Sequence, residues 1–131
     1  MRTHALWLRT SRIAAAAGLV LLAAPSAHAA VTNDANDFNL TESVSIYAAY
    51  ATTQTGGPSF RWLDIPSKNT YIAAGNCATN AAPAGERYFG AGSTSYQNLG
   101  WPTSSNACFF LRGRTAPGEG AMTFYDGRIS R

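Results

Sequence analysis

The sequence of 131 residues is long enough for one domain, and its formal net charge of +3 comes from 10 Lys and Arg against 7 Asp and Glu. Three of the arginines and both histidines fall in the first 29 residues, so residues 30–131 have as many basic as acidic side chains and no imidazole. This balance argues against a nucleic-acid-binding domain, and the missing imidazole excludes a Ser-His-Asp triad or a histidine-ligated metal site beyond residue 29.

Residues 1–29 have the pattern of a secretory signal peptide. Basic residues come first, the segment 13–24 is apolar, and Ala27-His28-Ala29 provides the small residues that signal peptidase requires. The apolar run is well short of the roughly 20 residues that a transmembrane helix needs. We therefore expect cleavage after Ala29, secretion to the extracellular space without a membrane span, and one domain over residues 30–131.

The first part of this domain is a polar segment that is followed by alternating apolar and polar residues. The segment 33–37 is polar, and we interpret it as a frayed entry, because it lacks the Gly and Glu of an EF-hand calcium loop. Apolar residues of one parity then predict a strand with one buried face, either bent or divided into two strands. Only Glu42 interrupts this stripe, and burial there would raise its pKa. The stripe consists of Phe38, Leu40, Val44, Ile46, Ala48 and Tyr50.

Turn residues divide the rest of the chain into short strands. The expected strands are 59–65, 70–74, 86–89, 107–114 and 121–129, and the last two are expected to form a hairpin. Residues 90–106 are predicted to be a long polar loop. Six or seven short strands with almost no helix signals predict an all-β domain, either an antiparallel β-sandwich or a small barrel.

The chain has two cysteines, Cys77 and Cys108. An isolated pair in an exported protein predicts a disulfide bond. On the chain-entropy model, closing a loop of this length stabilises the fold by roughly 3–4 kcal/mol.

Four residues are candidates for a binding surface. Tyr96 and Trp101 lie in the polar loop, where a rigid aromatic side chain suits a sugar- or protein-binding surface. The alternative is that Trp101 closes one end of the domain as part of the core. Arg112 and Arg114 share one face of a strand, and such a face can bind an anionic polymer or the carboxylates of a partner.

The composition of the leader and of the Gly-, Ser- and Thr-rich domain resembles that of small secreted proteins of high-GC Gram-positive bacteria. We expect a non-catalytic domain without cofactor or metal that binds an extracellular protein or polysaccharide, as an inhibitor or a toxin-like factor. One alternative is a small glycoside hydrolase, because that chemistry needs two carboxylates and no histidine. The other alternative is a structural component of the cell surface.

Overall fold

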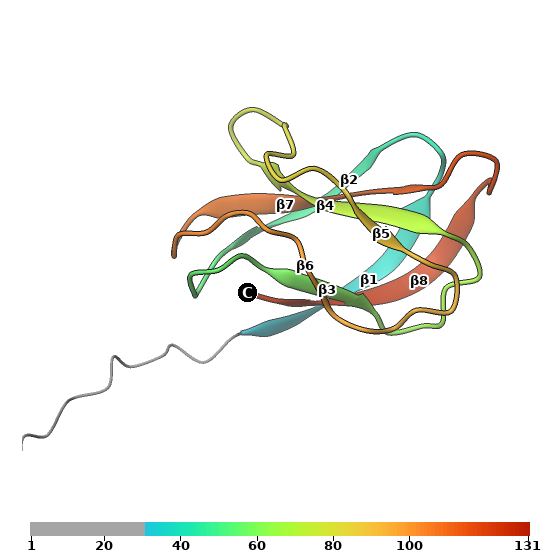
Figure 1. The fold of residues 1–131 in the computed structure, drawn as a ribbon, viewed down its shortest axis with the longest axis horizontal. Helices are drawn as coiled ribbons and strands as arrows, with labels where there is room; N and C mark the ends of the chain where they lie inside the picture. The colour runs from blue at the N-terminus through green and yellow to red at the C-terminus, as the bar shows by residue number, and fades with distance from the viewer. Residues whose placement is uncertain (1–30) are drawn as a thin grey trace, which may run out of the picture.

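The computed structural model describes residues 31–131, which form two layers of antiparallel strands (Figure 1). One sheet has the order β1-β8-β3-β6 and the other β2-β7-β4-β5. Within the described residues no helix is long and apolar enough to cross a membrane. The predicted signal peptide lies outside them. The strands are β1 (Thr32–Leu40), β2 (Ser45–Ala51), β3 (Ser59–Trp62), β4 (Thr70–Asn76), β5 (Arg87–Phe89), β6 (Gln97–Asn98), β7 (Cys108–Thr115) and β8 (Met122–Ser130).

The strand order is that of a jelly roll. β1 pairs with β8, β2 with β7, β3 with β6 and β4 with β5, as in one long hairpin of four strand pairs rolled into two sheets. Every connection except β4–β5 crosses from one sheet to the other. The predicted all-β fold is therefore confirmed, and of the two predicted architectures the chain adopts the sandwich.

The segment 33–37 belongs to strand β1, so its interpretation as a frayed entry is wrong. Its backbone pairs with β8, for example with Asp34 opposite Arg128. These two residues are 94 positions apart in the chain. A pairing over this separation stabilises a polar strand that has no apolar pattern of its own.

The predicted alternation of buried and exposed side chains is correct in β1 but wrong directly before β2 and in its first half. Val44 and Ile46 are 42% and 57% exposed instead of buried. The pairing of β2 with β7 is irregular between Ile46 and Ala49, and Tyr47 and Tyr50 are the residues of this strand that pack against the core. A shift of one residue in a strand reverses which side chains face the core, and this explains the error.

The predicted hairpin between the last two strands is also wrong. β7 pairs with β2 and β4, whereas β8 pairs with β1 and β3 in the opposite sheet. The turn between them leads the chain across the sandwich. Arg128 therefore lies in a different sheet from Arg112 and Arg114.

Aromatic rings fill much of the space between the sheets. Trp62 is fully buried, and its ring centroid lies 5.2 Å from that of Phe38 and 5.1 Å from that of Phe60. Its indole Nε1 donates a hydrogen bond to Thr70 Oγ1 at 3.1 Å, which joins the two sheets. Gly127 allows this packing, because a Cβ atom there would lie 2.5 Å from the ring of Phe60.

The predicted disulfide is confirmed. Cys77, directly after β4, is bonded to Cys108, the first residue of β7, with their Cα atoms 5.7 Å apart. The bond therefore joins two strands that are already neighbours in one sheet.

Candidate functional site

Tyr96 lies beside the outer face of the β1-β8-β3-β6 sheet. Its side chain is 43% exposed, and the guanidinium of Arg61 lies 5.0 Å from its ring centre. Such a stacked pair is a cation–π contact. Arg61 stands opposite Arg128 in the pairing of β3 with β8, so Tyr96 borders two adjacent arginines.

Arg112 and Arg114 project from β7 in the other sheet. Arg114 forms a salt bridge of 2.8 Å with Glu86 and lies 4.4 Å from the ring centre of Tyr71. The hydrogen bond to Glu86 raises the pKa of Arg114. Arg112 donates to the Asn80 carbonyl at 2.8 Å. Both arginines are thus engaged within the chain, in a different sheet from the strand β3 that Tyr96 borders.

Trp101 is half-buried and packs against the hydrophobic core. Leu99, directly before its Gly-Trp-Pro segment, and Pro102, the last residue of that segment, are both buried. This placement favours the alternative in which Trp101 closes one end of the sandwich. The four candidate residues therefore do not form one surface.

We expect Trp101→Ala to lower the free energy of unfolding by about 2–3 kcal/mol, somewhat less than the ~3–5 kcal/mol of a fully buried tryptophan. Thermal unfolding should then shift down by roughly 10 °C or more, since each kcal/mol moves the midpoint of a domain this size by about 4–8 °C. A midpoint that changes by no more than a few degrees would instead support the prediction that Trp101 belongs to an exposed binding surface.

Glu42 is exposed, so the prediction that it is buried in a strand is wrong. β1 ends at Leu40, and Glu42 lies in the following turn. Its Oε1 accepts hydrogen bonds from the backbone N–H groups of Gly118 and Gly120, at 3.0 and 3.1 Å. The Glu42 side chain therefore links the turn after β1 to the turn between β7 and β8.

In residues 31–131 no group of three or more His, Cys, Asp or Glu side chains is placed to hold a metal ion.

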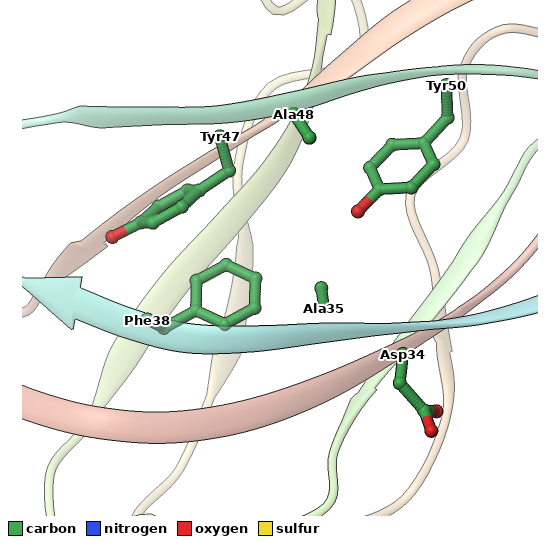
Figure 2. A pocket seen from close by; sticks show the side chains of 6 residues that line it. All are labelled: Asp34, Ala35, Phe38, Tyr47, Ala48 and Tyr50. Carbon is green, nitrogen blue, oxygen red and sulfur yellow. The ribbon is translucent and has the colours of Figure 1, made fainter.

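A cleft of about 240 Å³ opens between β1 and β2, the two strands that border the same edge of the sandwich. Figure 2 shows Phe38 directed from β1 toward β2 and Tyr47 and Tyr50 directed from β2 toward β1, whereas the Asp34 carboxylate points away. The cleft is smaller than the roughly 300–1,000 Å³ of sites for drug-sized ligands, so its capacity is about one ring. Its lining consists of Asp34, Ala35, Phe38, Tyr47, Ala48 and Tyr50.

The two tyrosines of the cleft differ in their hydrogen bonding. Tyr47 donates its hydroxyl to the Asn39 carbonyl at 2.8 Å. The Tyr50 hydroxyl has no hydrogen-bond partner among the described residues, and Figure 2 shows it directed into the space between the strands. Burial raises the pKa of Tyr50, and the nearby charge of Arg131 partly opposes this. The hydroxyl is therefore protonated at neutral pH and is free both to donate and to accept a hydrogen bond.

Asp34 at the rim of the cleft is held as a carboxylate. Arg128 donates to its two oxygens at 2.5 and 3.2 Å, and this hydrogen bonding lowers the pKa of Asp34. A bidentate guanidinium pair also fixes the orientation of the carboxylate. Asp34 is therefore charged at neutral pH and is not suited to act as a general acid.

The fold and the cleft together define a small jelly-roll domain with an aromatic site at one edge of its sandwich. The chain matches no family model, no curated protein and no solved structure. No pattern in the sequence indicates this site. Tyr50 belongs to the predicted buried stripe, whereas Tyr47 has the opposite parity and was not predicted to face the core, and only the irregular pairing of β2 brings both rings to the cleft.

Proposed function

We propose that this protein is a secreted, non-catalytic domain whose cleft binds a sugar ring of an extracellular polysaccharide. The observation that carries the proposal is the Tyr50 hydroxyl, which lies unpaired in a cleft that is lined, apart from Asp34 at its rim, by aromatic and small side chains. A sugar ring has apolar C–H faces and a polar edge of hydroxyl groups. A tyrosine ring offers an apolar surface and a polar tip in the same way.

The carboxylate at the rim of the cleft supports binding rather than hydrolysis. A glycosidase uses two carboxyl groups, and the one that protonates the leaving group needs a raised pKa. Asp34 is the one carboxylate in the cleft lining, and its pKa is lowered. The cleft therefore offers contacts for a sugar without the acid and base that would cleave it.

The test is co-sedimentation of the mature protein with insoluble cellulose, chitin, xylan and peptidoglycan, comparing the wild type with Tyr50→Phe. We expect retention on at least one polymer and a weakening of about 2–10-fold in the variant, because the substitution removes one hydrogen bond of ~0.5–1.5 kcal/mol and keeps the ring. The thermal unfolding midpoint should stay nearly unchanged, since the Tyr50 hydroxyl bonds to no described residue.

Tyr88→Phe is the matched control. Tyr88 is 50% exposed on β5, away from the cleft, so its loss of a hydroxyl should leave polymer binding intact. The proposal fails if none of the four polymers retains the wild type, or if the Tyr50 and Tyr88 variants bind equally well.

A further inference from the structure

Phe124 on β8 combines an exposed ring with an unfavourable backbone. Its side chain is 77% exposed, and its φ of 61° is in the left-handed region, which a bulky residue seldom adopts. The pairing of β8 with β1 is irregular here, and the Phe124 N–H donates to Asn39 Oδ1 at 3.2 Å instead of to the ladder. The fold thus holds a large apolar ring in solvent in a conformation that glycine or asparagine would adopt more easily. Backbone strain of this kind is concentrated at functional positions.

A second exposed apolar side chain belongs to the same end of the sandwich. Ile65, in the connection between β3 and β4, is 73% exposed. This connection lies against β8, because Leu63 N–H donates to the Asp126 carbonyl at 2.8 Å and the Tyr125 hydroxyl donates to Ser67 at 2.9 Å. Phe124 and Ile65 therefore flank one region of the molecule.

Negative charge surrounds this region. Five of the seven carboxylates of residues 31–131 lie in or beside the turns at this end, together with one cation, Lys68, whose Nζ donates to the Glu119 carbonyl, and we call the region the acidic end. Asp37 N–H donates to the Asp126 carboxylate, and Asp126 N–H donates to that of Asp64. The Glu42 carboxylate accepts from backbone N–H groups of the turn between β7 and β8, and Glu119 in that turn accepts from Asn69, just before β4. The two salt bridges within residues 31–131 involve Glu86 and Asp34. The other five carboxylates therefore have no ion-pair partner among the described residues. The five are Asp37, Glu42, Asp64, Glu119 and Asp126.

We propose that Phe124 and Ile65 dock a second protein, which receives the Phe124 ring in an apolar pocket and surrounds it with Lys or Arg side chains. Exposed aromatic side chains are typical anchors of protein interfaces, and complementary charge selects the partner and speeds association. The acidic end would repel an anionic membrane surface, a nucleic acid or the same end of a second copy of this chain. A basic protein surface is the partner that satisfies both the apolar and the charged residues. This docking is independent of the sugar site.

Stability and binding should move in opposite directions in Phe124→Gly. Glycine relieves the left-handed conformation and little burial is lost, so we expect the thermal unfolding midpoint to rise by a few degrees. The binding probe is a pair of bead-displayed peptide libraries with central Leu, Ile or Val, one flanked by Lys and Arg and the other by Asp and Glu. The wild type should be retained on the basic library about tenfold more strongly, and Phe124→Gly should lose this preference.

Two further variants separate the contribution of the carboxylates of the acidic end from that of the Phe124 ring. Asp37→Asn combined with Glu42→Gln keeps the left-handed residue and the turn contacts, so it should weaken binding to the basic library several-fold without moving the midpoint. Val31→Ser removes an exposed apolar side chain whose backbone pairs with Arg131, away from the acidic end, and should bind like the wild type. The proposal is overturned by equal retention on the two libraries, by unchanged binding of Phe124→Gly, by a lowered midpoint for that variant, or by a wild-type dimer that Phe124→Gly dissociates.

Discussion

Replacing Trp62 by alanine is expected to lower the free energy of unfolding by about 3–5 kcal/mol, as large-to-small core substitutions do. Trp62 is fully buried, and its ring lies within 6.2 Å, centroid to centroid, of those of Phe38, Phe60 and Tyr125. The change opens a cavity between the sheets and leaves the Thr70 hydroxyl without its indole donor. Each kcal/mol moves the midpoint of a domain this size by about 4–8 °C, so the thermal unfolding midpoint should be at least ~12 °C lower.

Two comparisons make this expectation specific. Trp62→Phe keeps most of the ring volume but not the N–H donor, so it should cost less than the alanine variant. Ile46→Ala removes a side chain that is 57% exposed and should change stability by no more than about 0.5 kcal/mol. Equal midpoints for Trp62→Ala and Ile46→Ala would show that the core is not built around the indole.

The positions of most strands could be predicted from the sequence because local signals agree there. β3, β4, β5 and β7 lie within two residues of their expected ends except at the end of β3, which stops at Trp62. Turn residues bound each of them, and their β-branched and aromatic content suits a pleated, half-buried surface. β6 was missed because Gln97 and Asn98 are too few for any periodicity to appear.

The topology could not be predicted, because local turn signals do not say which sheet a strand joins. The turn at 117–120 is compatible with a hairpin, yet β8 crosses to the other sheet. There it is the central partner of β1 and β3, strands from the opposite half of the chain. The polar β1 forms only because of this long-range pairing, which no pattern within residues 33–37 reveals.

The residues of the two proposed sites were hidden for a related reason. Alternation along β8 places Phe124 on the same face as the buried Met122, and alternation along β2 separates Tyr47 from Tyr50. Irregular pairings in both strands reverse these assignments. Such irregularities often occur beside functional sites, and a period-two pattern cannot locate them.

Removing the disulfide, by replacing both Cys77 and Cys108 with alanine, is expected to cost about 3–4 kcal/mol on the chain-entropy model. Both cysteines are exposed, and the strands β4 and β7 that they flank remain paired through seven register positions without them. The native fold should therefore persist, with the tyrosine and tryptophan bands of its near-ultraviolet circular dichroism unchanged. The loss arises mainly in the unfolded chain, which becomes free to open the 31-residue loop.

Thermal unfolding of the double variant should show a midpoint at least ~12 °C lower, at ~4–8 °C for each kcal/mol. The wild type unfolded in the presence of a reducing agent is the matched control, and its midpoint should agree with that of the double variant. The Cys77 and Cys108 thiols should resist alkylation in the native wild type and react only after reduction. If the midpoint of the double variant stays within a few degrees of the wild type, the chain-entropy account fails for this loop, and the paired strands alone restrict the unfolded chain as much as the bond does.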